Sequence, residues 1–470
     1  MLRRTFASSP RLGKTHKPYS PLQATTPTLT FFNSVRPPTS SSAATGDLGD
    51  ASSNVIPSFR LLSPVGTLPP SIPSVLEKEP VDPVKLQRML EVMTTLPVLD
   101  QILYSSQRQG RISFYMTSYG EEGSVVGSAA AWGDKDEVFA QYREVGVLLW
   151  RGYPLSSLMA QVFSSASDTA TLGRQMPVHY GSPTHHFHTI SSPLATQFPQ
   201  AAGAAYALKL RKQKLIAEGK EEDGGCVICY AGEGASSEGD FHAGLNMASV
   251  LGGPINNGFA ISTPTSEQYA SDGIASRGPG YGIDTIRVDG NDPLAVYVAC
   301  REARRRAVEG EGRAVLVESM SYRVGHHSTS DDSSAYRSID DVNTISKLDS
   351  PLTRLRKYLE SLPPTPASSG DPVPLWSAEH DKLVKDKVKK DVLAAFQKAE
   401  KEKKPALVHG MFGDVFAPLE GAEDGEVLER PQREQRDELR RLVEKWGGKH
   451  EGWKKELAKF DGGREAVLRG

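Results

Sequence analysis

The stretch YAGEGASSEGDFHAGLNMASVLGGPINNGFAISTP, residues 230–264, decides how this chain folds and where its chemistry lies. A short apolar run, residues 226–230, leads into it and predicts a buried strand that ends at Gly232-Glu233-Gly234. Glycines at the end of a strand let backbone amides approach a phosphate, and a helix-like segment follows them. The stretch therefore predicts a strand, a phosphate-binding turn and a helix.

The same stretch carries oxygen donors that suit a magnesium ion, which takes carboxylate, amide and carbonyl oxygens in an octahedron. Glu233 offers a carboxylate, Asn257 a side-chain amide and Phe259 a backbone carbonyl. A glycine-acid-glycine turn alone is a weak signal, and the Asn-Asn-Gly that follows makes a magnesium-diphosphate site considerably more specific. An ordinary glycine-rich turn with an unrelated Asn-Gly turn is the alternative.

Around this stretch, from about residue 111 to 321, apolar runs alternate with helical segments. This alternation predicts an α/β fold with a doubly wound, mostly parallel sheet, in which ligands bind beyond the carboxyl ends of the strands. A helix should open at Asp292-Pro293, with the acid as cap and proline at the first helical position. Four apolar runs are candidate strands: Val147–Trp150, Cys226–Tyr230, Thr285–Val288 and Ala314–Met320.

Two further helices are predicted from apolar residues that recur at helical spacing. The first contains Leu86 to Met93, and Pro97 should end or kink it. The second contains the stripe from Val384 to Phe396, which lies among lysines. Cys226 and Cys229 lie three apart within one predicted strand, so they should face opposite sides of the sheet and pack in the core.

Composition narrows the classes of function. Lys plus Arg number 55 and Asp plus Glu number 57, so the nearly balanced charge indicates no nucleic-acid partner. No apolar run is long enough to cross a membrane. The first acid is Asp47, and the residues before it are basic and rich in Ser, Thr and Pro. Residues 1–46 therefore read as a mitochondrial transit peptide, with a disordered basic tail as the alternative.

The same reading divides the chain into four parts. The leader at 1–46 is followed by a disordered or extended linker at 47–84, rich in Ser, Pro and Thr. The α/β domain is expected at 85–410. A charged, helical and solvated tail is expected at 411–470.

Six motifs stand in one order along the chain. They are RISFYMTSYGEEG (111–123), QYREVG (141–146), GRQMPVHYG (173–181), ISSPLATQ (190–197), ISTPTSEQY (261–269) and YRVGHHSTSDDSSAYRS (322–338). Together they closely resemble the alpha subunits of branched-chain 2-oxo acid dehydrogenases, over roughly residues 85–400. The resemblance implies a thiamine diphosphate-binding fold, with thiamine diphosphate, Mg²⁺ and a structural K⁺ as cofactors.

The resemblance also implies roles for matching positions. Gln141, Tyr142 and Arg143 would contact the diphosphate and the substrate, and the guanidinium fork suits phosphate oxygens. Ser192 and the Leu194 backbone would contact the pyrimidine end of the cofactor. Gly232, Glu233, Gly234 and Asn257 complete the predicted cofactor site, and the potassium site would comprise Ser191, Pro193, Thr196 and Gln197. By composition alone, SSPLATQ would be a turn and a helix start.

His327 is the predicted catalytic residue and also a cofactor contact. It would hydrogen-bond the substrate or shuttle a proton, work that suits a group titrating near neutral pH. Ser328 and Ser338 match the family's regulatory phosphorylation positions. Phosphate on Ser328 would add about two negative charges beside Asp331 and Asp332 and should disorder the loop.

The activity implied by the resemblance is decarboxylation of a branched-chain 2-oxo acid in the mitochondrial matrix, with the cofactor as electron sink. The acyl group would pass to a lipoyl group of the acyltransferase component. Implied partners are a beta subunit in an alpha2-beta2 heterotetramer, the acyltransferase core, a kinase and a phosphatase. The pyruvate-using relative is a second interpretation, disfavoured by GHHSTSDDSSAYRS. A structural or regulatory subunit that binds no cofactor is a third.

The third interpretation arises because few residues separate the predicted helix at 238–250 from Asn256. Relatives place a longer strand, ending in arginine, before Asn-Asn-Gly, whereas here residues 252–255 lead straight into Asn256. A helix over 238–250 would span roughly 18–20 Å. Residues 252–257 must span a similar distance back toward the cofactor, and a fully extended chain of that length reaches at most roughly 17–18 Å. Either the sequence lacks a coded segment, or the cofactor half-site is impaired.

Overall fold

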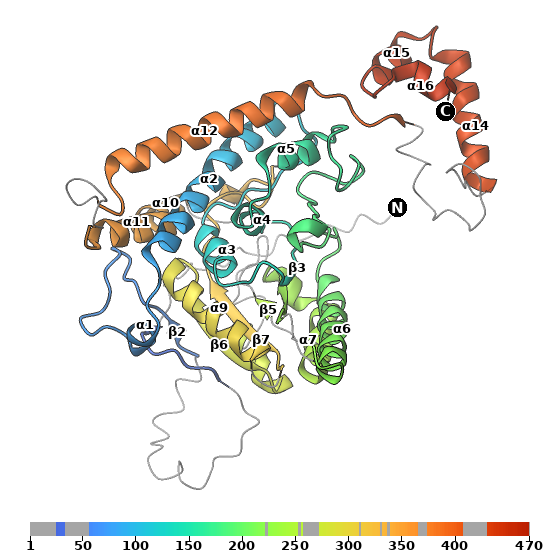
Figure 1. Ribbon diagram of the computed structural model, residues 1–470. Coiled ribbons are helices and arrows are strands. Elements are labelled where there is room, and N and C mark those ends of the chain that lie inside the picture. Colours follow the sequence, from blue (N-terminus) through green and yellow to red (C-terminus); the bar gives the residue numbers. More distant parts are fainter. Residues whose placement is uncertain are drawn as a thin grey trace, which may run out of the picture.

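The centre of the molecule is a parallel sheet in the order β1-β2-β6-β7-β5-β4-β3 (Figure 1). The computed structural model describes residues 25–32, 56–220, 224–251, 255–256, 272–309, 312–329, 331–335, 339–364, 374–407 and 430–469. The strands described are β1 Thr25–Thr26, β2 Ser58–Phe59, β3 Glu137–Phe139, β4 Val227–Tyr230, β5 Ile255–Asn256, β6 Asp284–Asp289 and β7 Val315–Met320. The predicted α/β fold with a parallel sheet is confirmed.

Three of the four predicted strands are present, as β4, β6 and β7. The fourth prediction is wrong, because residues 147–150 belong to helix α4, Val145–Trp150. Val147 and Leu148 are fully buried and Trp150 nearly so. A short apolar run that is buried all round has no periodicity to separate a strand from a buried helix.

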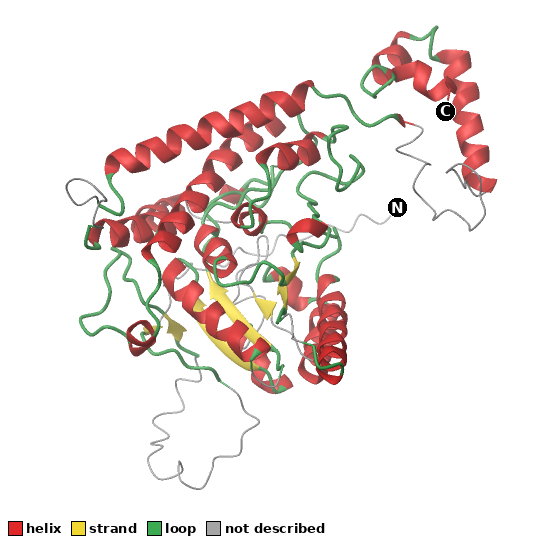
Figure 2. Cartoon of the chain, viewed as in Figure 1, coloured by secondary structure: helices red, strands yellow, loops and turns green. Residues whose placement is uncertain are grey.

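Helices cover both faces of the sheet (Figure 2). Alternate residues of β4 face opposite cores: Ile228 and Tyr230 join the cluster beneath α2, α3 and α9, and Cys229 joins the one beneath α6 and α7. Cys226 lies in the first cluster, and both thiols are free and buried, so core packing on opposite faces is confirmed. The principal helices are α2 Pro83–Arg108, α3 Glu122–Ala129, α5 Leu155–Phe163, α6 Gln197–Ala217, α7 Gly239–Leu251, α9 Pro293–Val308, α10 Ile339–Leu348, α11 Pro351–Ser361 and α12 Ala378–Lys401.

Two of these helices test predictions about their ends. Helix α9 begins as predicted, because the Asp292 side chain accepts a hydrogen bond from the Ala295 N–H at 3.0 Å and Pro293 follows. Helix α2 does not end at Pro97 but continues to Arg108. Leu96 and Leu99 on either side of the proline are fully buried, and their burial offsets the lost helical hydrogen bond.

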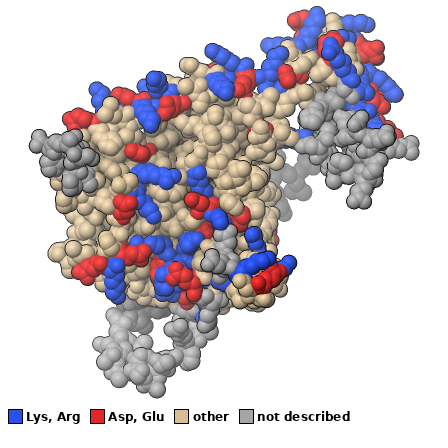
Figure 3. All heavy atoms as spheres, viewed as in Figure 1, with Lys and Arg blue, Asp and Glu red and all other residues tan. Residues whose placement is uncertain are grey.

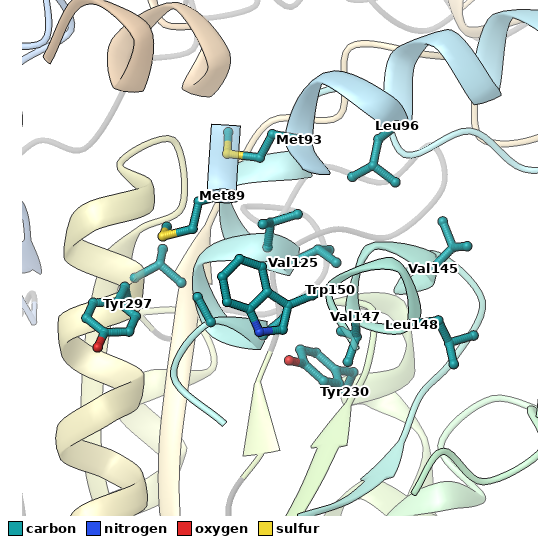
Figure 4. Close-up of a cluster of buried hydrophobic side chains, with 14 of the residues drawn as sticks. Met89, Met93, Leu96, Val125, Val145, Val147, Leu148, Trp150, Tyr230 and Tyr297 are labelled. Atoms are coloured by element: carbon teal, nitrogen blue, oxygen red, sulfur yellow. The ribbon is translucent and has the colours of Figure 1, made fainter. Parts of the chain in front are cut away.

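The larger core lies between α2, α3, α4 and the sheet (Figure 4). Met89, Met93 and Leu96 from α2 meet Val125 from α3 and the apolar side chains of α4. The Arg88 guanidinium lies over the Trp150 ring at 4.2 Å from its centre. This packing fixes the carboxyl end of β3, since α4 begins six residues after that strand ends.

Strand β5 is very short for its position. It lies between β4 and β7, and the pairs described are Cys229–Ile255, Tyr230–Asn256 and Ile255–Leu316. The opposite edge of β7 pairs with β6 along six residues of β7, from Val315 to Met320. Two residues of the short interval noted in the sequence, Ile255 and Asn256, are thus described as a strand. Asn257 and Phe259 lie outside the described residues.

The segment before α2 belongs to the fold. Strand β2 pairs with β6, and β1 pairs with β2. Leu61 and Leu62 are buried, and their N–H groups donate to the Asp292 carboxylate at 2.7 and 2.5 Å. Residues 58–62 fall in the predicted linker; Ser58–Phe59 form β2, and bends follow at residues 61–62. This segment is held in place by hydrogen bonds to β6 and to the Asp292 cap of α9, which are distant from it in the sequence.

The tail predicted to be a solvated charged helix or coil is helical but has a core of its own. Helices α14 Arg430–Trp446, α15 Glu451–Leu457 and α16 Gly463–Arg469 enclose Val443, Leu457 and Val467. The Lys404 backbone pairs with residues 459–461, which joins this unit to the end of α12. The predicted stripe on α12 is buried at Val392 and Phe396.

Basic and acidic side chains are interspersed over the face that Figure 3 shows, in keeping with the small net charge. Within the described part of the chain, none of the helices has the length and apolarity that a membrane crossing would need.

Candidate active site

A recess opens at the carboxyl ends of β3, β4 and β7, where a doubly wound sheet is expected to bind its ligand. Segments far apart in the sequence meet there because parallel strands end at one edge. The recess is lined by Glu121, Gln141, Tyr142, Arg143, Glu144, Gly232, Ser321, Arg323 and His327. Five of the residues predicted from sequence are therefore brought together: Gln141, Tyr142, Arg143, Gly232 and His327.

The glycine turn after β4 is tied to the loop after β3. The Gly232 N–H donates to Gln141 Oε1 at 2.9 Å. The Gln197 side-chain amide donates to the Tyr230 carbonyl at 2.9 Å and lies 3.5 Å from Gln141 Oε1. A residue predicted for the potassium site thus supports the predicted diphosphate turn.

Glu233, the predicted metal ligand, does not line the recess. It is fully buried and precedes the 3₁₀ turn Gly234–Ser237. The buried Ser236 hydroxyl two residues beyond Gly234 has no hydrogen-bond partner among the described residues. A buried carboxylate and a buried hydroxyl on one turn offer hard oxygens of the kind that Mg²⁺ prefers. The described residues contain no cluster of three or more His, Cys, Asp or Glu side chains that could hold a metal.

His327 lies between two arginines. Arg323 Nη1 is 2.9 Å and Arg143 Nη2 3.2 Å from its Nδ1. Arg143 Nη2 also donates to the His327 carbonyl at 2.7 Å, and the His327 N–H donates to Asp331 Oδ2 at 2.7 Å. Guanidinium groups only donate, so Nδ1 must accept. The ring proton therefore resides on Nε2.

The charge of His327 follows from the same neighbours. Burial lowers its pKa to about 3, and Arg143 and Arg323 contribute to the lowering, whereas Asp331 opposes it. The expectation of a group titrating near neutral pH is wrong, because two fixed positive charges and a desolvated ring disfavour the imidazolium. At neutral pH, His327 is a neutral donor through Nε2–H.

Several carboxyl groups lie in or near the recess; Glu121 is half-buried, and the others are buried. Glu121 lies 3.8 Å from Arg143 Nε; burial raises its pKa, and Arg143 and Arg323 partly oppose that. Burial raises the pKa of Glu144 to about 7 and that of Glu122 to about 8. Asp100, which accepts from the Ser118 N–H at 2.6 Å, has its pKa raised to about 7, again by burial.

The predicted pyrimidine and potassium residues lie on one turn before α6. Thr196 Oγ1 donates to the Pro193 carbonyl at 3.2 Å, and Ala195 between them is buried with a φ of 65°. The Ser192 hydroxyl forms a hydrogen bond with His179 Nε2 at 2.7 Å. Leu194 packs against the α6–α7 core, and Ser191 is half-buried. The turn thus gathers hydroxyl, carbonyl and amide oxygens, which are suitable ligands for a hard cation.

The predicted phosphorylation positions differ in what the structure describes. Ser328 is half-buried, and its carbonyl accepts from the Asp331 N–H at 3.2 Å. It follows His327 directly, so a group added there lies beside the recess. Ser338 lies outside the described residues.

Sequence reasoning missed Arg323 and Glu121 as site residues. Each lies inside a motif already recognised, YRVGHHS for Arg323 and YGEEG for Glu121. The signal available in the sequence was spacing: Arg323 precedes His327 by four residues, and Glu121 directly follows a glycine. In the structure, that glycine has a φ of 92°. An added Cβ on that glycine, Gly120, would lie 2.1 Å from the Tyr322 carbonyl, so the two segments are packed in direct contact.

Comparison with known proteins finds relatives that cover most of the chain. Residues 90–408 match the family model described as the dehydrogenase E1 component. The chain is 53% identical over 370 residues to the mitochondrial 2-oxoisovalerate dehydrogenase subunit alpha of Macaca fascicularis, covering 77% of each chain. Its human counterpart shows the same values. The Caenorhabditis elegans relative is 51% identical over 357 residues, covering 75% of each chain.

Proposed function

This chain belongs to the dehydrogenase E1 component family, and on that premise we propose that it is the alpha subunit of a 2-oxoisovalerate dehydrogenase. It takes part in the oxidative decarboxylation of branched-chain 2-oxo acids and in transfer of the acyl group to a lipoyl group of an acyltransferase. The observation that carries the proposal is the convergence of Arg143, Gly232 and His327 in one recess at the carboxyl edge of the sheet.

The residues present fit thiamine diphosphate with Mg²⁺. The cofactor, when bound, supplies the electron sink for decarboxylation. Arg143 would bind phosphate oxygens through its guanidinium fork, and Glu233 would hold Mg²⁺ together with Asn257 and Phe259. Gly232, Gly234, Gln141 and Tyr142 would complete the diphosphate wall, with Ser192 and Leu194 toward the pyrimidine.

His327 would act on the substrate without changing its charge. Its Nε2–H is the free donor, because Nδ1 accepts from the arginines. A neutral imidazole donor can polarise a carbonyl oxygen or hold a proton near it without an imidazolium. K⁺ would be held by Ser191, Pro193, Thr196 and Gln197, which shapes the turn before α6.

A beta subunit would complete this site in an alpha2-beta2 heterotetramer. The described residues enclose only about 30 Å³ in this recess, so they would hold part of the cofactor, and the beta subunit would hold the rest. Helices α6 and α7 pack together and expose large apolar side chains, and such surfaces mark protein contacts. These exposed side chains are Tyr206, Leu210, Met247 and Val250.

Further partners follow from the proposed role. The acyltransferase core would present its lipoyl group at the recess, and a kinase and a phosphatase would act on Ser328 and Ser338. Phosphate on Ser328 would face the carboxylate of Asp331, which holds the His327 N–H, and repulsion would disorder that segment. The proposed location is the mitochondrial matrix.

We keep the four-part division as a proposal as well. Residues 1–46 would be the transit peptide, 47–84 a linker whose residues 58–62 pack against the sheet domain, 85–410 the cofactor-binding domain and 411–470 the tail. N-terminal sequencing of the protein isolated from mitochondria tests the first boundary, and a mature chain that begins well before residue 47 would contradict it.

One observation favours a second function. Because the interval before Asn257 is short and only Ile255–Asn256 of it are described as a strand, a structural or regulatory subunit with an impaired cofactor half-site is the second candidate. Titration of the assembled protein with thiamine diphosphate and Mg²⁺ separates the two functions. Family-like affinity excludes the impaired subunit.

The test of the main proposal is turnover by the full chain assembled with its beta subunit. We expect release of carbon dioxide from 3-methyl-2-oxobutanoate to depend on thiamine diphosphate and to exceed that from pyruvate. Faster turnover of pyruvate would favour the pyruvate-using relative instead.

A further inference from the structure

The short loop between β3 and α4 contributes several of the residues that line the recess. It contains only residues 140–144, because β3 ends at Phe139 and α4 begins at Val145. Gln141, Tyr142 and Arg143 line the recess from this loop. Their backbone N–H groups lie outside any strand or helix, and those of Gln141 and Arg143 are buried with their residues.

Both buried N–H groups have the same acceptor. Glu144 Oε2 accepts from the Gln141 N–H and from the Arg143 N–H, each at 3.0 Å. The Glu144 side chain is itself buried, with the residue 8% exposed. Buried N–H groups must be satisfied, and one carboxylate oxygen that satisfies two of them fixes the chain between them.

Side chains of this loop form hydrogen bonds with the other segments that line the recess. Gln141 Oε1 accepts from the Gly232 N–H, which leads directly into Glu233. Arg143 donates to the His327 carbonyl at 2.7 Å and to the Thr117 carbonyl. The loop therefore touches the glycine turn on one side and His327 on the other.

We propose that Glu144 is a positioning residue for the cofactor site, because its buried carboxylate holds the loop that presents Gln141 and Arg143. It acts through these two residues rather than on the cofactor or substrate. The inference rests on the proposed function and deepens it, since it names the group that preorganises the diphosphate contacts. Removing the Glu144 carboxylate should loosen the loop and displace Gln141 and Arg143, whose contacts need sub-ångström accuracy.

Two variants test this in the full chain assembled with its beta subunit. Glu144→Ala removes the shared acceptor, whereas Glu144→Gln keeps an oxygen of the same reach. Hydrogen exchange of a peptide spanning 139–146, without cofactor, should be faster in Glu144→Ala and close to wild type in Glu144→Gln. Should Glu144→Ala fail to assemble, Glu144→Asp, one carbon shorter, replaces it with the same expectation.

Cofactor titration supplies the second readout. The Kd for thiamine diphosphate in saturating Mg²⁺ should rise about tenfold or more in Glu144→Ala, with most of the affinity restored in Glu144→Gln. The matched control is Asp136→Ala. Asp136 is a fully buried carboxylate that accepts from the Gly133 and Cys226 N–H groups, before β3 and away from the recess. This control should lower the Tm and leave the Kd unchanged.

Three results would overturn the proposal: unchanged exchange in Glu144→Ala, faster exchange with an unchanged Kd, or an equal rise in Kd in Asp136→Ala. A wild-type assembly that binds no thiamine diphosphate would instead reject the proposed function. The role of Glu144 would then fall with it, and the exchange data would still show whether the two hydrogen bonds form, so the two failures are distinguishable.

Discussion

His327 and its two arginines show how a single residue acquires its chemistry. An isolated histidine titrates near neutral pH, but burial and the charges of Arg143 and Arg323 lower its pKa to about 3. The arginines also occupy Nδ1, which leaves the proton on Nε2. The residue is thereby suited to donate a hydrogen bond across the neutral range rather than to switch its charge.

This arrangement predicts an order of activity among substitutions. The amide nitrogen of Gln can lie near the position of Nε2, whereas that of Asn lies nearer Nδ1, where a donor would oppose the arginines. We expect His327→Asn to lower kcat about 10²-fold or more and His327→Gln to retain more activity. Turnover of 3-methyl-2-oxobutanoate by assembled variants measures this. Equal losses, or an inflection near pH 6.5 that His327→Gln abolishes, would contradict the assignment.

At the scale of elements, β5 matters because it lies between β4 and β7 and only two of its residues are described. Its neighbour β7 has six residues paired with β6, yet the described pairing with β5 reaches only Leu316. A central strand normally stabilises both neighbours through a full ladder and through side chains on both faces. Two residues between β4 and β7 provide little of either.

We therefore expect the natural transcript to encode additional residues between Gly252 and Asn256, which would extend β5 toward the recess. The physical reason is the mismatch between a two-residue strand and its six-residue neighbour. Sequencing cDNA across this interval decides the matter. A transcript that encodes Gly252-Gly253-Pro254-Ile255-Asn256 without insertion would refute the expectation and favour the impaired half-site.

At the scale of the whole molecule, buried carboxyl groups set the dependence of stability on pH. Burial raises the pKa of Asp100 and Glu144 to about 7, of Glu122 to about 8 and of Asp292 to about 6. The folded chain keeps these protons to a higher pH than the unfolded chain does. Their stabilising contribution is therefore complete below about pH 4 and is lost as pH rises through these values. His327 acts oppositely, because its lowered pKa costs stability as pH falls below about 6.5.

Glu122→Gln isolates one of these contributions. The amide stays neutral at every pH, so the Tm of the variant relative to wild type should increase between pH 5 and 8. The matched control is Glu400→Gln, since Arg111 lowers the pKa of that exposed carboxyl and it is fully ionised over the same range. Its Tm difference from wild type should stay constant. A constant difference for Glu122→Gln as well would rule out the proposed linkage.

Local patterns in the sequence by themselves determined the strands at β4, β6 and β7, the capped start of α9, and the motifs that identify the family. These depend on neighbouring residues: apolar runs, a cap followed by proline, and fixed spacing. The interpretation of 147–150 as a strand failed because a short buried run has no distinguishing period.

Only the tertiary structure decided the rest of the site. Arg143 and His327 are 184 residues apart, yet their contact sets the tautomer and the pKa of the histidine. The pairing of β2 with β6 and the burial of Glu144 likewise depend on segments that meet only after folding. Burial and the electric field at a residue are properties of its surroundings in space. The turn at Gly232–Gly234 could therefore be predicted from the sequence, whereas the residues that contact it could be identified only in the folded chain.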